Sequence, residues 1–119
     1  MVNEVSRVAI VAVSVAPLGT GSTSVSRYVA AAERVLREDG RVRYRLDPMF
    51  TTLEGDLATI FEIILKMHEA VAQEGVQRIS TVIKIDDRRD KQAPMERKVE
   101  VVEAILAQET GDAGKRESR

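Results

Sequence analysis

The alternation of apolar and polar positions divides the chain into extended and helical segments, beginning with a strand near the N-terminus. Residues 7–15 form an almost unbroken run of β-branched residues and alanine, which is typical of a central strand. Pro17, Gly19 and Gly21 follow closely and predict a loop. We therefore expect the first strand to end before Pro17.

A helix is predicted after this loop. Ser22 or Thr23 is positioned to cap its first turn, and Gly40 is positioned to end it. The apolar residues that repeat at helical spacing between these limits are Val25, Tyr28, Val29, Ala32, Val35 and Leu36.

A shorter pattern over residues 42–54 predicts two strands joined as a hairpin, because Asp47-Pro48 near its middle favours a turn. Gly55 and Asp56 then introduce a second helix, which closes at Gly75. The predicted buried stripe of this helix consists of Leu57, Ile60, Phe61, Ile64, Leu65, His68 and Val71.

The last third of the chain predicts one more strand and one more helix. Residues 77–85 alternate with a period of two, so they form an amphipathic strand with Ile79, Thr81, Ile83 and Ile85 on one side. A charged loop follows, and Pro94 suits the start of a helix. The apolar positions of this third helix are Met95, Val99, Val102 and Leu106.

The order of elements is therefore βαββαβ with an additional C-terminal helix. This order predicts an α+β fold, a two-layer sandwich in which an antiparallel sheet carries two helices on one face. A chain of 119 residues with 44% apolar content fills one core, so we expect a single domain over residues 1–109. The polar residues 110–119 are expected to form a frayed tail.

Composition narrows the classes of function. The chain has no cysteine and a single histidine, which excludes disulfides, thiolate sites and multi-histidine metal sites, so we expect no metal and no cofactor. The formal net charge of −1 provides no field that attracts nucleic acid or a membrane surface. Residues 1–4 lack the basic start of a secretory signal, and we expect a cytoplasmic location.

One face of the predicted sheet has no helix to cover it. Alternate residues of a strand point to opposite faces of the sheet. If the valine-rich set of alternate positions in the first strand, which includes Val11 and Val13, faces the helices, the other set forms an open face. The members of the open face are then Val8, Ile10, Ala12, Ser14, Phe50, Thr52, Glu54, Val82 and Lys84. An exposed apolar patch of this kind is typical of an interface, which predicts a homodimer or homotetramer formed sheet to sheet. The alternative is that the third helix folds over this face within one chain.

Four members of the open face are polar, namely Ser14, Thr52, Glu54 and Lys84. Polar groups trapped at an interface must find partners or cost about 1 to 3 kcal/mol each. Either a bound polar ligand satisfies them, or they pair with one another or with the partner chain.

Three stretches of the chain resemble the thiamine-binding protein family, formerly a conserved family of unknown function. They are residues 14–19 with Ser24, residues 48–55, and residues 83–88 with Lys91, in this order around one histidine-bearing helix. The resemblance implies a ferredoxin-like subunit that assembles through its sheet, often as a tetramer. It also implies binding of thiamine or a related pyrimidine at a subunit interface, without known catalysis and therefore without catalytic residues.

The ligand-binding residues that we expect from the open face and from these stretches are Ser14, Pro17, Leu18, Gly19, Ser24, Phe50, Thr52, Glu54 and Lys84. Glu54 could accept a hydrogen bond from the protonated pyrimidine or offset the thiazolium cation, with Phe50 stacking on a ring. Ser14 and Thr52 could bond the pyrimidine edge. The loop 17–24 precedes a helix start, where backbone donors suit the anion of a thiamine phosphate, although a self-capped turn is the alternative.

Two other functions stay open at this point. A small enzyme acting on a pyrimidine precursor would need Glu54 or Asp86 as a general base of raised pKa. A regulatory or structural protein would use the open face to recruit another protein. The alternating charges of residues 86–91 largely cancel, and His68 is expected to be a hydrogen-bonded core or interface residue.

Overall fold

The computed structural model describes the backbone of residues 8–117 and the side chains of residues 8–110. The elements in chain order are β1 (Val8–Leu18), α1 (Ser26–Asp39), β2 (Arg43–Leu46), β3 (Thr51–Asp56), α2 (Leu57–Ala72), β4 (Arg78–Asp86) and α3 (Met95–Glu117). This order confirms the predicted βαββαβ arrangement with a C-terminal helix, an α+β fold of the ferredoxin-like type. Residues 1–4, on which the prediction about a secretory signal rests, and Arg7, the predicted start of the first strand, lie outside the described residues.

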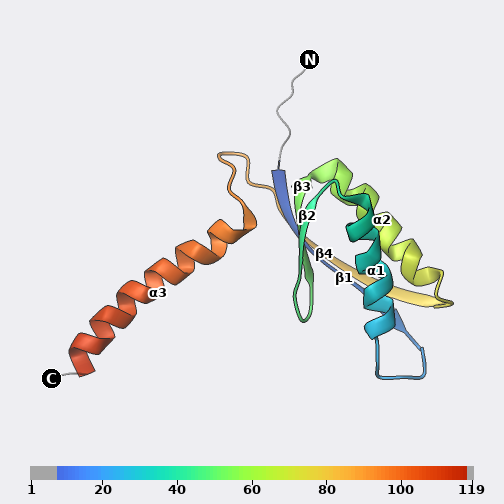
Figure 1. Ribbon diagram of the computed structural model, residues 1–119, viewed down its shortest axis with the longest axis horizontal. Helices are drawn as coiled ribbons and strands as arrows, with labels where there is room; N and C mark the ends of the chain where they lie inside the picture. Colours follow the sequence, from blue (N-terminus) through green and yellow to red (C-terminus); the bar gives the residue numbers. More distant parts are fainter. Residues whose placement is uncertain (1–7, 118–119) are drawn as a thin grey trace, which may run out of the picture.

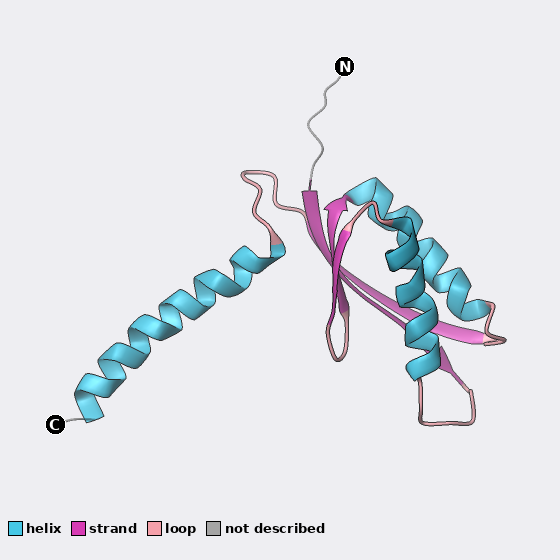
Figure 2. Cartoon of the chain, viewed as in Figure 1, coloured by secondary structure: helices cyan, strands magenta, loops and turns pink. Residues whose placement is uncertain are grey.

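The four strands form one antiparallel sheet in the order β2-β3-β1-β4. Helices α1 and α2 lie side by side on one of its faces (Figures 1 and 2). Val13 of β1 pairs with Thr51 of β3 and with Ile83 of β4, so these three side chains share the helix-covered face. Neither α1 nor α2 covers the opposite face, which we call the open face, as predicted.

Strand β1 continues past the point where the sequence places its end. Pro17 lies within β1 and pairs with Ile79, and the strand ends at Leu18. Beyond Val13, β1 pairs with β4 but no longer with β3. One edge of the strand has no neighbour there, and proline is tolerated on strands with such an edge. The prediction that the strand ends before Pro17 is therefore wrong.

Helix α1 starts without the side-chain cap that the sequence predicts. Its N-cap is Val25, which provides no capping hydrogen bond. The Ser22 hydroxyl instead accepts from the backbone N–H of Ser24, within the loop. At the other end the prediction is confirmed, because Gly40 adopts the left-handed conformation with φ of 74° and its N–H donates to the carbonyl of Leu36.

Helix α2 starts as predicted, but its buried stripe is rotated. Asp56 caps the helix by accepting from the N–H of Thr59 at 3.0 Å. Phe61 and Leu65 of the predicted stripe are 46% and 62% exposed, so this part of the prediction is wrong. The buried residues of α2 are Ile60, Ile63, Ile64, Met67 and Val71. The helix is apolar around much of its circumference, and the pattern alone therefore allowed two stripes.

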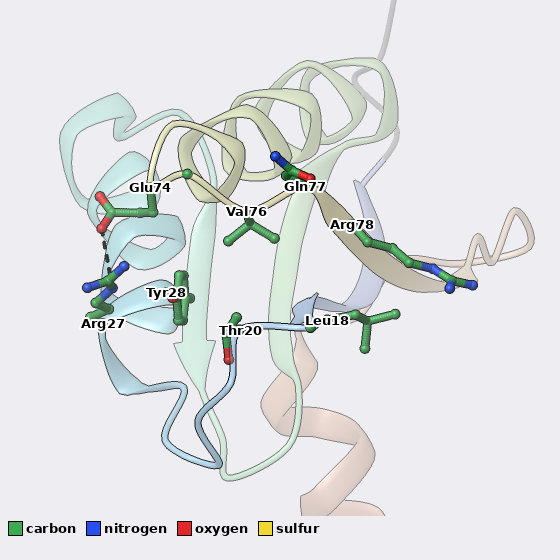
Figure 3. A pocket seen from close by; sticks show the side chains of 10 residues that line it. Leu18, Thr20, Arg27, Tyr28, Glu74, Val76, Gln77 and Arg78 are labelled. Atoms are coloured by element: carbon green, nitrogen blue, oxygen red, sulfur yellow. Dashed lines mark ion pairs between the residues drawn. The ribbon is translucent and has the colours of Figure 1, made fainter.

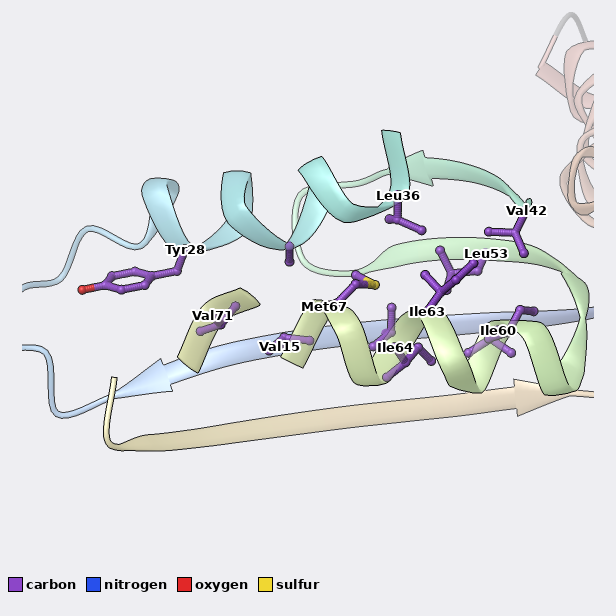
Figure 4. Packing of buried hydrophobic residues seen from close by; sticks show 13 residues of the cluster. Val15, Tyr28, Leu36, Val42, Leu53, Ile60, Ile63, Ile64, Met67 and Val71 are labelled. Atoms are coloured by element: carbon purple, nitrogen blue, oxygen red, sulfur yellow. The ribbon is translucent and has the colours of Figure 1, made fainter. Parts of the chain in front are cut away.

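The core lies between the covered face of the sheet and the two helices (Figure 4). Its largest side chains with almost no exposure are Leu36, Leu53, Ile60, Ile63, Met67, Val11, Val13 and Val71. At about 25 cal/mol per Å² of apolar area, this burial is the main favourable contribution to folding. Ile83 and Ile85 point to the same side but are 38% and 41% exposed, because β4 is an edge strand that the helices do not fully cover.

Helix α3 is present as predicted, directly after Pro94, and extends away from the two-layer body (Figure 1). Met95 is buried, but the described side chains of residues 97–110 are all exposed. The radius of gyration of 18.6 Å exceeds the roughly 13.5 Å of a compact domain of this length. Within one chain, only the beginning of α3 contacts the open face, where the N–H of Met95 donates to Glu54, and the rest of the helix leaves that face uncovered. The backbone is helical to Glu117, and the fraying of residues 110–119 stays a prediction.

Candidate ligand-binding site

The residues predicted to bind a ligand do not meet in one cavity. Leu18 and Gly19 line a hollow at the end of β1, which we call the loop hollow. Thr52 and Lys84 line a second one on the open face, the sheet-face hollow. Ser14 and Phe50 line a third beneath the β2–β3 turn, the hairpin hollow. The other three predicted residues, Pro17, Ser24 and Glu54, line none of these three hollows.

The sheet-face hollow has a volume of about 260 Å³ and lies between the open face and the first turns of α3. Thr52 and Lys84 are joined there by Arg45 and Asp86, above an apolar floor that includes Ile10. Asp86 forms an ion pair with Lys98 of α3, and this neighbour holds the pKa of the Asp86 carboxyl below its usual range. The hollow therefore offers a hydroxyl and several cations to a polar ligand.

Glu54 adjoins this hollow but already has hydrogen-bond partners. Arg43, directly opposite on β2, donates to both of its oxygens at 3.0 Å, and the N–H of Met95 donates to Oε1 at 2.7 Å. Arg43 also donates to Glu96 at 2.6 Å, and hydrogen bonds to Glu96 and Glu54 raise the pKa of Arg43. The Glu54 side chain is only 11% exposed. This network attaches the first turn of α3 to β2 and β3.

The loop hollow is larger, about 610 Å³, and more polar (Figure 3). Arg27 forms an ion pair with Glu74 at 3.7 Å and lies 4.8 Å from the centre of the Tyr28 ring. Within the loop, the N–H of Ser22 donates to the Thr20 hydroxyl, and the N–H of Ser24 donates to the Ser22 hydroxyl. These donors are occupied inside the loop, which favours the self-capped turn over an anion site.

The charged loop after β4 pairs its own charges. Arg88 binds Asp90 at 2.7 Å, and Arg89 binds Asp87 at 2.9 Å. A hollow of about 600 Å³ lies beside this loop, lined by apolar residues of β1 and α3 and by basic residues that include Lys91 and Arg97. The sequence predicts that the opposite charges of residues 86–91 largely cancel, and these local ion pairs are how they do so.

The hairpin hollow brings in a residue that the sequence analysis does not name. Glu33 of α1 points toward Thr51, whose hydroxyl donates to Glu33 Oε2 at 2.7 Å. Burial raises the pKa of the Glu33 carboxyl, and the Thr51 hydrogen bond opposes this rise. A signal was available, because Glu33 follows Val29 by four residues and precedes Leu36 by three, and so lies on the predicted apolar stripe.

The single histidine of the chain lies on α2 and contacts the sheet. His68 is half-buried, and its Nδ1 lies 2.8 Å from the Thr81 hydroxyl, so the predicted hydrogen-bonded histidine is confirmed. Among the side chains of residues 8–110, no group of three histidine or carboxylate residues could hold a metal ion. No helix in the described part of the chain is long and apolar enough to cross a membrane.

The order of elements and the four-stranded antiparallel sheet define a small α+β domain of the ferredoxin-like type. Residues 11–103 match the family described as thiamine-binding protein, and the chain belongs to this family. It is 44% identical over 101 residues to the UPF0045 protein YqgV of Bacillus subtilis, covering 82% of this chain and 97% of that protein. It is 49% identical over 90 residues to a UPF0045 protein of Methanothermobacter thermautotrophicus, covering 75% and 90%. The solved structure of MJ1052 from Methanocaldococcus jannaschii superposes with a TM-score of 0.73 at 37% identity, over 81% of this chain and 96% of that one.

Proposed function

We propose that this protein binds thiamine, a thiamine phosphate or a related aminopyrimidine, without catalysis, at an interface between copies of the chain. The observation that carries the proposal is the family match over residues 11–103, which includes the three stretches that resemble the family in the sequence. The fold and the hollows support a binding role but do not by themselves select the ligand.

The sheet-face hollow supports a site completed by a second copy. Its volume of about 260 Å³ is slightly below the usual range of roughly 300 to 1,000 Å³ for small-molecule sites, and it is open on the side away from the sheet. A second chain placed over the open face would enclose it. Thr52 and Lys84 could then bond a phosphate or another polar group at one end of the ligand.

Exposed apolar side chains support the association of copies. Val82 on the open face is 50% exposed, and α3 exposes a further row of large apolar residues. That row consists of Val99, Val101, Val102, Ile105 and Leu106. A single helix with such a row gains little stability alone in water, so cover by a homodimer or homotetramer is expected.

The ion pairs of the open face favour binding over catalysis. The rival enzyme needs Glu54 or Asp86 as a general base of raised pKa. Lys98 instead lowers the pKa of Asp86, and both oxygens of Glu54 accept hydrogen bonds from Arg43. Asp86 therefore lacks the environment that a neutral-pH base requires, and the oxygens of Glu54 are already occupied by donors of the chain.

Isothermal titration tests the proposal directly. The purified protein, at a known oligomer concentration, is titrated with thiamine, thiamine phosphate, thiamine diphosphate and the free aminopyrimidine. We expect saturable binding of at least one of them. If a folded, ligand-free preparation binds none, the small-molecule proposal fails, and recruitment of a protein partner by the open face becomes the better account.

A further inference from the structure

One acidic side chain at the rim of the covered face has a hydrogen-bond partner for only one of its oxygens. Thr51 donates to Glu33 Oε2 at 2.7 Å. Glu33 Oε1 is buried and accepts no hydrogen bond from any described residue. A buried carboxylate oxygen without a donor is costly to the folded state. This atom is therefore an acceptor that a ligand N–H could satisfy.

The hairpin hollow adjoins this acceptor. Its volume is about 70 Å³, and it is bounded by α1, by the β1 residues Val13 to Val15 and by the β2–β3 turn. Beyond Val13, β1 has lost its neighbour β3, so the hollow lies along an unpaired strand edge. At about 30 Å³ for each water-sized group, it holds about two such groups. It suits the substituted edge of a small ring, with the rest of the ligand outside.

The lining selects the chemistry of the ligand. Glu33 and Asp47 are the only titratable side chains among the described residues that line the hollow, and both are acidic. Asp47 is paired with Arg45 at 3.3 Å, which leaves Glu33 as the available acceptor. The rest of the wall is largely apolar and includes Met67 and Phe50. An anion is disfavoured here, and a flat, weakly polar ring that carries an amino group fits.

We propose that Glu33, oriented by Thr51, accepts a hydrogen bond from the amino group of the bound aminopyrimidine and so determines the specificity of the site. This inference rests on the proposed function and assigns the pyrimidine end of the ligand to the hairpin hollow. Ser14, predicted to bond the pyrimidine edge, and Phe50, predicted to stack on a ring of the ligand, line the same hollow. Thr51 is a positioning residue, because it fixes the carboxylate through the other oxygen.

The replacement Glu33→Gln separates this role from a structural one. A glutamine oxygen can still accept from Thr51, but its amide then presents N–H groups to the hollow where the carboxylate presented an acceptor. The test compares thiamine with oxythiamine, in which a carbonyl oxygen replaces the amino group. We expect the wild type to prefer thiamine. We expect Glu33→Gln to weaken thiamine binding about 10- to 100-fold, with a much smaller loss for oxythiamine.

A matched control is Glu38→Gln, which makes the same change at an exposed position of α1 and should leave both affinities unchanged. Thr51→Val keeps the shape of its side chain and should reduce the preference for thiamine by a smaller factor. It also serves as the second test if Glu33→Gln does not fold.

The outcomes distinguish the inference from the proposed function. If the wild type binds thiamine and Glu33→Gln binds both ligands with unchanged affinities, the inference is wrong and the proposed function stands. An equal loss for both ligands in Glu33→Gln also overturns it, because the effect would then be structural. If the wild type binds no thiamine compound, both fall together.

Discussion

The two faces of the sheet differ in how completely their side chains are satisfied. On the covered face, two helices and three strands enclose side chains such as Val11, Leu53 and Ile63, each with 0% exposure. On the open face, apolar residues of the same strands stay partly exposed and alternate with charged ones. The covered face buries its apolar side chains within one chain, whereas the open face leaves residues such as Val82 exposed, and we propose that a second copy covers them. One sheet can therefore support folding on one side and association on the other.

Glu54 and Glu33 lie at these two faces, and the one at the more exposed face has more hydrogen-bond donors around it. Glu54, on the open face, accepts hydrogen bonds from Arg43 and from the backbone of Met95. Glu33, at the rim of the covered face, has a donor for one oxygen only. This difference in hydrogen-bond partners is why we propose Glu33, and not Glu54, as the acceptor for the amino group of the ligand.

Introducing a charge on the open face should have the largest effect. In Val82→Asp, association through this face would bury an unpaired carboxylate, which costs about 3 to 5 kcal/mol. We expect the oligomer to dissociate into monomers, with the fold retained because Val82 is 50% exposed in the single chain. Size-exclusion chromatography with light scattering measures the mass of the particles.

The matched control is Val25→Asp, at a valine that is 42% exposed at the start of α1, away from the open face. It should leave the oligomer intact. An oligomer of Val82→Asp with the same mass as the wild type would contradict the assignment of the open face as the interface.

Removing the charge of Glu54 should have the next largest effect. If Glu54 also contacts the cationic ligand, Glu54→Gln weakens binding by about 1.5 to 3 kcal/mol, the range of a charge-assisted hydrogen bond. Isothermal titration with thiamine measures this loss.

The control for this variant is Glu96→Gln, which removes the other partner of Arg43 but leaves Glu54 in place. It should have little effect on affinity. If both variants weaken thiamine equally, the network acts by attaching α3, and the direct contact of Glu54 with the ligand is disproved.

The sequence predicted the fold well because its signals are periodic and local. The helix end at Gly40 follows from the conformational freedom of glycine, and the cap at Asp56 follows from its side-chain oxygen. Besides the missing side-chain cap of α1, two errors arose where contacts with other elements decide the structure. Pro17 is accommodated by an unpaired strand edge, and Phe61 lies outside the stripe because the packing of α1 selects which apolar arc of α2 is buried.

The site was less predictable than the fold. Patterns identify which side chains share a face, so they correctly placed Thr52 and Glu54 on the open face. They do not report which partner each polar atom finds, since Arg43 reaches Glu54 only through the pairing of β2 with β3. Glu33 was missed because a single charged residue beside an apolar stripe is normally placed at the solvent-exposed margin of the helix, and the sequence does not show that Thr51 lies opposite it.

Replacing the Glu33 pair with apolar residues should stabilise the protein slightly. The double variant Glu33→Leu with Thr51→Val removes the unsatisfied oxygen and the hydroxyl together, and such replacements are often neutral or favourable. We expect about 1 kcal/mol of added stability at neutral pH in urea unfolding, with loss of thiamine binding. The single variant Thr51→Val, which leaves the Glu33 carboxyl without its donor, should instead lose about 1 to 3 kcal/mol. A double variant less stable than this single one would show that Glu33 supports the fold.

The smallest expected effect is a pH dependence that belongs to Glu33. Burial raises the pKa of this carboxyl above its ordinary value of 4.5, so the folded state holds the proton more tightly than the unfolded chain does. The corresponding stability is fully present below that ordinary value and is lost as the pH rises through the raised pKa. Glutamine does not titrate, so the melting temperature of Glu33→Gln relative to the wild type should increase as the pH rises above that ordinary value. Glu38→Gln, which makes the same replacement at an exposed position of α1, is the reference variant for this comparison. A flat difference for Glu33→Gln would mean that the carboxyl is not desolvated, and the unsatisfied oxygen would then no longer distinguish Glu33 from Glu54.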